Sequence, residues 1–201
     1  MEGGALYIYG AITQEGMNVI NTWDKLMNLS DRMTDRSGLS VNFKHVQCGY
    51  SHAILTDEED KVYSMGAGIY GQLGTEVDHD TASYPVPVTD VNDGMDKILL
   101  IACGAHFSIC YSELGILYAW GMLIPEEVES IQRVPCFLAI SLPLDITELE
   151  LLSFRLVDIK ASFREILACD SQGRTFHCEL SVSQTLKPYK EQAQKVIGHC
   201  H

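Results

Sequence analysis

Short apolar segments separated by acidic or glycine-containing turns recur along the chain. Residues 46–55 and 98–111 are rich in β-branched and aromatic residues, and each is interrupted by one glycine. Polar turns follow at Thr56–Asp60, Ser112–Gly115 and Asp170–Gly173, and each lies between two apolar runs. This pattern predicts antiparallel strands joined by hairpins.

These segments belong to a repeat. When Cys48–Leu55 is aligned with Cys103–Cys110, 55 residues later, the next segments align without a gap, so that Gly66 meets Gly121. The same closing motif ends at Gly10, 56 residues before Gly66, and a degenerate copy near the end is shifted by 58 residues. A period of this length, built from short strands, glycines and aromatic residues, is typical of a β-propeller blade.

The motifs within the repeat resemble one family. Cys-Gly-x-x-His, Gly-x-Leu-Tyr-x-Trp-Gly and Gly-x-Gly-x-x-Gly-Gln-Leu-Gly, followed by a proline-containing strand, resemble the repeat of the regulator of chromosome condensation family. The copy at Gln47–Val88 carries nearly the whole pattern, whereas the second departs from it after Met122. The resemblance implies a seven-bladed propeller fold. Relatives of this kind include the exchange factor for the small GTPase Ran, ubiquitin ligases, a ciliary GTPase regulator and adaptor proteins, so the fold alone does not choose a function.

The length predicts an incomplete or open propeller. At about 55 residues per repeat, 201 residues correspond to about 3.7 all-β blades, fewer than the four of the smallest closed rings. A truncated isoform, a fragment, or an open arc whose edges a partner covers would each explain this length. We expect one partial propeller over residues 1–201, with repeat motifs at 4–10, 43–88 and 97–122 and a degenerate one at 156–178.

Three segments depart from the repeat. In Gly16–Met33 and Leu138–Phe154 apolar residues approximate a helical spacing, which predicts short helical insertions between blades or partner-binding segments, with core packing as the default. Residues 179–201 are expected to form an irregular or helical tail.

The charge limits the classes of partner. Lys and Arg number 14 and Asp and Glu 27, giving a net charge of −13, which disfavours direct binding of nucleic acid or of an anionic membrane. No apolar run reaches the roughly 18 residues of a membrane-spanning helix, and the N-terminus lacks a secretory signal, so we expect a cytoplasmic or nuclear protein. The densest acidic run is Asp57, Glu58, Glu59 and Asp60. It predicts a solvated hairpin turn or, as a functional alternative, a loop that contacts a basic partner.

Residues that invite a chemical interpretation are better explained by the repeat. Gly66–Gly71 spells a dinucleotide-binding motif, but no helix-like sequence follows it. His52 and His106 recur at related repeat positions, which favours packing over catalysis or metal binding. His177-Cys178 and His199–His201 lack the spacing of a zinc site. We therefore predict no catalytic, cofactor-binding or metal-binding residues, and assign structural roles to Gly10, Cys48, Gly49, His52, Gly66, Gly71, Gly74, Cys103, Gly104, Trp120 and Gly121.

Seven cysteines, an odd number mostly flanked by apolar residues, favour reduced, buried thiols over a disulfide framework. The hypothesis that follows is a non-enzymatic propeller that binds a protein partner and regulates a small GTPase. The alternative is a guanine-nucleotide exchange factor for a Ras-like GTPase, or a truncated isoform of one.

Overall fold

The computed structural model describes residues 6–8, 11–14, 17–21, 27–28, 41–75, 81–88, 97–122, 138–140, 154–179 and 187–188. Within these ranges the chain forms only strands, turns and loops, and no helix. The prediction of an all-β fold is therefore confirmed.

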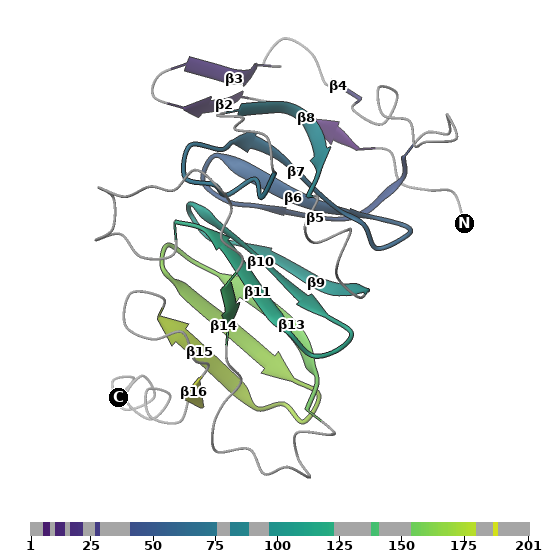
Figure 1. Ribbon diagram of the computed structural model, residues 1–201, viewed down its shortest axis with the longest axis vertical. Helices are drawn as coiled ribbons and strands as arrows, with labels where there is room; N and C mark the ends of the chain where they lie inside the picture. Colours follow the sequence, from purple (N-terminus) through teal and green to yellow (C-terminus); the bar gives the residue numbers. More distant parts are fainter. Residues whose placement is uncertain are drawn as a thin grey trace, which may run out of the picture.

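Three four-stranded antiparallel sheets form the body of the molecule (Figure 1), and in each the strands lie in sequence order. Blade 1 contains β5 (Phe43–Cys48), β6 (His52–Asp57), β7 (Val62–Ala67) and β8 (Thr81–Pro87). Blade 2 contains β9 (Ile98–Cys103), β10 (Phe107–Ser112), β11 (Leu117–Gly121) and β12 (Leu138–Ile140). Blade 3 contains β13 (Leu156–Ala161), β14 (Glu165–Asp170), β15 (Thr175–Glu179) and β16 (Lys187–Pro188).

The N-terminal part forms two smaller sheets. β1 (Tyr7–Ile8) pairs with β4 (Met27–Asn28), and β2 (Ala11–Gln14) pairs with β3 (Met17–Asn21). The helix suggested by the apolar spacing of Gly16–Met33 is thus wrong at Met17–Asn21, which is a strand. This segment includes two adjacent β-branched residues, and pairing with β2 satisfies its backbone groups in a ladder.

The two other irregular segments also contribute strands. Leu138–Ile140, at the start of the second predicted helical segment, is β12 and pairs with β11, while residues 141–153 lie outside the described part. In the segment expected to be an irregular or helical tail, Lys187–Pro188 pairs with β15, and residues 189–201 lie outside the described part. Each segment therefore supplies the fourth strand of a blade.

The blades stack face to face, and each joint is filled by apolar side chains. Ile54 of blade 1 and Ile109 of blade 2 occupy equivalent positions of β6 and β10, and both are fully buried. Leu167 takes the same position in β14 but is 48% exposed, because no described strand lies beyond blade 3 (Figure 1). The joint between blades 1 and 2 comprises Ile54, Val62, Val88, Ile98, Ile101, Cys103, Cys110 and Trp120. The joint between blades 2 and 3 includes Phe107, Ile109, Tyr111, Leu117, Leu156, Ile159, Ile166 and Phe176.

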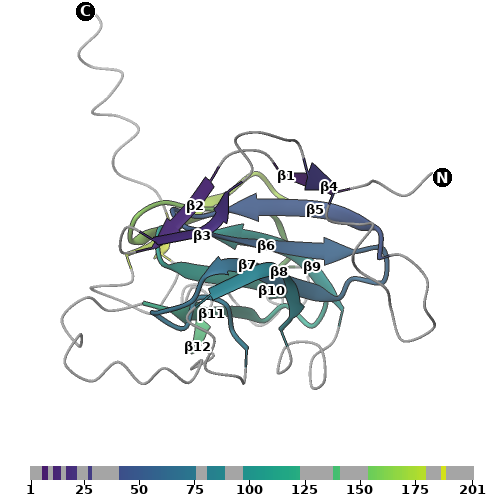
Figure 2. The same cartoon turned by 90° about the horizontal axis from the view of Figure 1, so that it is seen from above.

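The stack is an open arc. The first strands of the blades, β5, β9 and β13, contact one another in turn, as the inner strands of a propeller do. Viewed from above, the four strands of blade 1 lie side by side, with the smaller β2–β3 sheet against them (Figure 2). The described sheets do not close into a ring, which confirms the prediction of an incomplete propeller.

The glycine that ends each repeat motif has a steric role. Gly66 and Gly121 have φ of 105° and 104°, a backbone conformation that residues other than glycine rarely adopt. A Cβ atom at Gly66 would lie 2.5 Å from the Ser51 carbonyl oxygen, and one at Gly121 would lie 2.6 Å from that of His106. The chain therefore requires glycine where the third strand of the blade passes the first hairpin.

Candidate protein-interaction surface

Blades 1 and 2 are joined by a buried polar network. The Gln72 carbonyl, in the loop after β7, accepts hydrogen bonds from Ser108 Oγ at 2.9 Å and from Trp120 Nε1 at 3.0 Å. His52 Nε2 lies 3.0 Å from the same Ser108 hydroxyl. Because the single hydroxyl proton of Ser108 is directed at Gln72, His52 Nε2 must be the donor. Burial lowers the pKa of His52 to about 4, which keeps this imidazole neutral near pH 7.

Most of the predicted repeat residues line this joint and its edges. Trp120 is fully buried, and Gly74, with φ of 64°, lies so close that a Cβ atom there would be 2.6 Å from Trp120 Nε1. Gly71 ends a turn in the same loop, in which its N–H donates to the Gly68 carbonyl. Of the glycines of the apparent dinucleotide-binding motif, Gly66 thus lies in β7 and Gly68 and Gly71 belong to the turn, and no helix follows them among the described residues. Gly10 lies outside the described residues.

The two repeat cysteines differ in environment. Cys103 is buried, and its thiol donates a hydrogen bond to the Gln47 carbonyl of blade 1 at 3.3 Å. Burial raises the pKa of Cys103 to about 12, so the thiol stays protonated. Cys48 takes the equivalent position in β5 and is exposed, although partial burial also raises its pKa. None of the five described cysteines forms a disulfide.

The acidic hairpin between β6 and β7 uses half of its carboxylates internally. Asp57 is buried, accepts hydrogen bonds from the N–H groups of Glu59 and Lys61, both at 2.9 Å, and accepts one from a tyrosine hydroxyl. Asp60 pairs with Lys44 of its own blade and, at 2.9 Å, with Lys97 at the start of blade 2. Glu58 and Glu59 are exposed, and Glu59 pairs with Lys61. Only these two glutamates present their carboxylates outward from the predicted contact loop.

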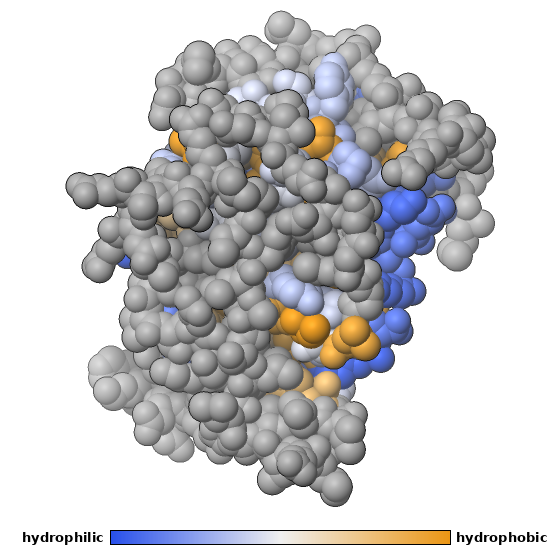
Figure 3. Space-filling view, viewed as in Figure 1, coloured by the Kyte–Doolittle hydropathy of each residue, from blue (hydrophilic) through white to orange (hydrophobic). Residues whose placement is uncertain are grey.

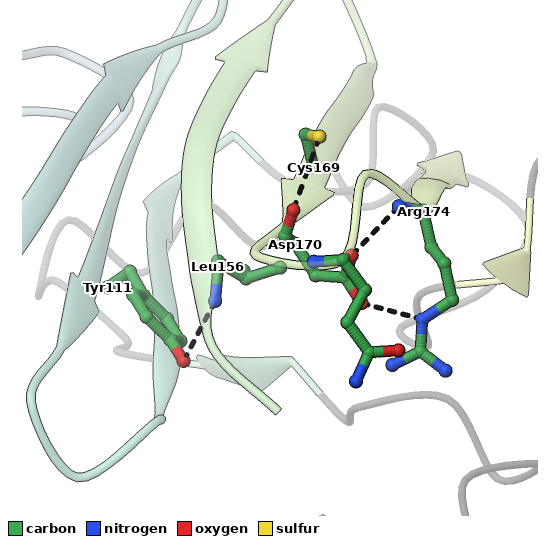
Figure 4. Close-up of polar contacts among 6 residues, drawn as sticks. Tyr111, Leu156, Cys169, Asp170 and Arg174 are labelled. Carbon is green, nitrogen blue, oxygen red and sulfur yellow. Dashed lines mark hydrogen bonds and ion pairs between the residues drawn. The ribbon is translucent and has the colours of Figure 1, made fainter. Parts of the chain in front are cut away.

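The same turn chemistry recurs in each blade, which the charge pattern alone did not reveal. Ser112 and Asp170 occupy the position of Asp57. The hydroxyl of Ser112 accepts from the Ile116 N–H, and the carboxylate of Asp170 accepts from two backbone N–H groups and from the Arg174 guanidinium (Figure 4). Burial alone would raise the pKa of Asp170, but these hydrogen bonds and the charge of Arg174 outweigh it and lower the pKa below its ordinary value.

These three hairpins lie at one end of the blades. Each is tied to the start of its own blade by a backbone hydrogen bond, such as Ser171 N–H to the Arg155 carbonyl at 2.9 Å. Figure 3 shows a band of hydrophilic residues along the side on which the β6–β7 hairpin lies in Figure 1, with some exposed hydrophobic residues further down. This end is a solvated surface of mixed charge.

The opposite end of the blades carries a row of aromatic rings that the sequence analysis did not single out. It is formed by the hairpins that join the first two strands of each blade. Tyr50 of blade 1 is 82% exposed and Phe163 of blade 3 is 62% exposed. The ring of His106, from blade 2, lies between them, with ring centroids 5.7 Å from Tyr50 and 6.3 Å from Phe163. We call Tyr50, His106 and Phe163 the aromatic ridge; Tyr70 supports it from 4.9 Å.

The backbone holds the ridge in place. The Tyr50 N–H donates to the Ala105 carbonyl and the Ala105 N–H donates to the Ser162 carbonyl, both at 3.2 Å, so the three hairpins are bonded in series. Gly49 makes this approach possible, because a Cβ atom there would lie 2.4 Å from the Gly104 carbonyl oxygen. The sequence does contain a signal for the ridge. Tyr50 lies two residues after Cys48, and Phe163 lies two residues after Ala161, the residue aligned with the repeat cysteine.

The remaining residues that invite a chemical interpretation are not brought together in the described part of the chain. No three His, Cys, Asp or Glu side chains of the described residues come together to hold a metal ion. His177 and Cys178 are successive residues of β15, so they point to opposite faces of the sheet. His199–His201 lie outside the described residues. No helix in the described part is long and apolar enough to cross a membrane.

Comparison with known proteins identifies the repeat. Residues 59–111, which run from the β6–β7 hairpin of blade 1 to β10 of blade 2, match the family model of the regulator of chromosome condensation (RCC1) repeat. The chain contains an RCC1 repeat. The match crosses the boundary between two blades, so the repeat counted along the sequence is offset from the structural blade.

Two relatives match part of the chain in sequence. The regulator of chromosome condensation of Xenopus laevis is 38% identical over 74 residues, which are 37% of this chain and 16% of the relative. The X-linked retinitis pigmentosa GTPase regulator of Canis lupus familiaris is 31% identical over 84 residues, which are 42% of this chain and 8% of the relative. The chain thus spans only a small part of the length of these relatives.

The fold is shared more widely than the sequence. The crystal structure of Prp20p from Saccharomyces cerevisiae superposes with a TM-score of 0.64 at 18% identity, covering 88% of this chain and 39% of Prp20p. The superposition therefore extends well beyond the residues matched by sequence. It shows that the blades have the fold of an RCC1-type β-propeller, of which the described sheets form an arc.

Proposed function

We propose that this RCC1-repeat protein is a non-enzymatic protein-interaction module that regulates a small GTPase by binding it or a protein associated with it. The observation that carries the proposal is the arrangement of its RCC1-type blades. Their hairpins are bonded in series, so three blades present one continuous surface. Such a surface provides binding sites without requiring any catalytic side chain.

The names of the relatives support the class of partner. One relative is a GTPase regulator, and the structure of Prp20p was described together with its binding to Gsp1p and to histones. We extend from these only the general role in GTPase regulation. The net charge of −13 favours a protein partner with a basic surface over direct contact with nucleic acid or insertion into a membrane. Location in the cytoplasm, the nucleus or both belongs to the same proposal.

The alternative function is guanine-nucleotide exchange on a Ras-like GTPase. The sequence likeness to the frog regulator of chromosome condensation, whose family includes an exchange factor, favours it. Exchange would act by stabilising the nucleotide-free state of the GTPase, which is a shift of population and needs no bond-making residue in this chain.

One experiment separates the two functions. The purified chain is added to a panel of small GTPases loaded with a fluorescent guanine nucleotide, and both complex formation and nucleotide release are measured. We expect complex formation with at least one GTPase, or with a protein that accompanies it, while the release rate stays at its intrinsic value. Faster nucleotide release from any GTPase would contradict the non-enzymatic function and support the exchange function. If no complex formed, both functions would be contradicted.

A further inference from the structure

The two faces of blade 3 differ in chemistry. On β14 and β15 buried residues alternate with exposed or half-buried ones. The strands equivalent to β14 in the other blades, β6 and β10, are instead buried at all six of their residues. Alternation of this kind is typical of an antiparallel sheet with one face in the core and the other in solvent. Blade 3 therefore has one joint face, towards blade 2, and one outer face.

Within the two joints, the neighbours of the central isoleucine are small. Ile109 of β10 lies directly opposite Ala102 of β9 and Ala119 of β11, and all three are buried. Ile54 of β6 lies directly opposite Ser64 of β7, and both are buried. Small, uncharged side chains at these positions let the next blade pack directly on the isoleucine.

On the outer face of blade 3 the same positions carry larger polar side chains. Leu167 of β14 lies directly opposite Lys160 of β13 and His177 of β15. Lys160 also forms an ion pair with Asp158 at 2.8 Å, and both side chains of this pair are more than half exposed. Another sheet packed on this face would take the pair out of water, and the hydration lost in this way can exceed the attraction that remains.

The first residue of β14 follows the same rule. Glu165 takes the position that Phe107 has in β10 and His52 has in β6. Phe107 and His52 are buried in the joints of their blades, whereas Glu165 is exposed. A carboxylate thus stands where each of the other blades places a buried ring.

We propose that the outer face of blade 3 is a cap that ends the stack: it stays in solvent and forms no joint with a further blade or with a second copy of this chain. Stacked repeats need such polar outer faces at their ends to remain soluble. The chemistry of this face carries the assignment, whatever the length of the chain. A capped arc is compatible with either outcome of the GTPase panel, so the proposed function and the cap succeed or fail separately.

The test measures the mass of the full chain in solution by sedimentation velocity over a range of concentrations. Lys160→Ala/Glu165→Phe places the joint residues of blade 2 on the outer face of blade 3, and it should make the mass rise with concentration towards that of two or more chains. Lys61→Ala/Glu113→Phe is the matched control, because it makes the same two exchanges at exposed residues of the β6–β7 and β10–β11 hairpins. The control should keep the mass of the wild-type chain.

A separate variant tests the wild-type face directly. Leu167→Asp adds a charge at the position where the joints have an isoleucine, and on a solvated face it should leave the mass of the chain unchanged. Far-ultraviolet circular dichroism checks that each variant keeps its strands. If Lys160→Ala/Glu165→Phe fails to fold, Leu167→Asp decides alone.

Two results would overturn the cap. One is a wild-type assembly that Leu167→Asp dissociates, since that assembly would use the outer face as a joint. The other is an equal mass for folded Lys160→Ala/Glu165→Phe and its control, since the polar side chains would then not be what keeps the face apart. A wild-type assembly that Leu167→Asp leaves intact supports the cap, because it forms through another surface.

Discussion

The stacking of the blades predicts a large difference between two equivalent residues. Ile109 and Leu167 occupy the same position in the second strands of blades 2 and 3, but Ile109 is fully buried against blade 3 and Leu167 is 48% exposed. Replacing either by alanine removes three carbon groups. The position in the stack, and not the chemistry of the change, should therefore decide the cost.

The magnitudes follow from burial. For Ile109→Ala, three groups at about 0.8 kcal/mol each give about 2.4 kcal/mol of lost transfer free energy, and the cavity left in the joint raises the total to about 3 kcal/mol. Leu167 is already half exposed and leaves no closed cavity, so Leu167→Ala should cost about 1 kcal/mol. With a urea slope of about 2 kcal/mol/M, the midpoints should fall by about 1.5 M and about 0.5 M.

The assay is urea unfolding followed by tryptophan fluorescence, to which the fully buried Trp120 of blade 2 contributes. Far-ultraviolet circular dichroism on the same samples checks that both variants keep their strands. Equal shifts for the two variants would refute the reasoning, because they would mean that the outer face of blade 3 is covered as completely as that of blade 2.

Three further predictions concern single groups. Gly66→Ala should lower Tm by about 5 °C or more, since its Cβ would meet the Ser51 carbonyl oxygen at 2.5 Å. Gly173 has φ of 77° but nothing lies within 4 Å of the position of a Cβ atom, so Gly173→Ala should lower Tm by less in the same thermal melt. The pKa of His52 is about 4 in the folded chain and near 6.5 in the unfolded chain, so the unfolded chain binds the proton first as the pH falls. The free energy of unfolding should therefore decrease by up to about 3 kcal/mol between about pH 6.5 and pH 4. His52→Gln should flatten this part of a pH series of urea midpoints. Asp170→Ala should destabilise by about 1–3 kcal/mol by leaving backbone N–H groups unpaired, and Asp170→Ser, which restores the acceptor found at Ser112, should recover part of that loss in the same denaturation assay.

Repetition made the fold predictable from the sequence. A match at a constant spacing, as between Gly66 and Gly121, reports a steric requirement that recurs in each blade, and the φ values of both glycines are those that only glycine adopts readily. The helical interpretation of Met17–Asn21 was wrong for the opposite reason. That segment lies outside the recognisable repeat, and a short apolar run is compatible with the periodicity of either a helix or a strand. Here pairing with β2 makes it a strand.

The interaction surface was harder to predict because charge and exposure do not coincide. The run Asp57–Asp60 stands out in the sequence, yet two of its four carboxylates serve the turn and the joint to blade 2. The ring at Phe163 does not stand out, because single aromatic residues are common in strands and cores. Its importance depends on Tyr50 and His106, which lie far away in the sequence and become neighbours only when the blades stack.

The arc explains how the excess negative charge and a protein partner are compatible. Carboxylates such as Asp57 and Asp170 are held inside turns by backbone N–H groups, and Asp60 is neutralised by two lysines, so the described hairpin end carries less outward negative charge than its composition implies. The aromatic ridge lies at the other end of the same strands, and its flank carries Glu165 and Glu179. Long-range attraction between the acidic chain and a partner with a basic surface would increase their rate of encounter. Salt should therefore slow the association of such a partner with the chain, measured as the association rate at increasing ionic strength.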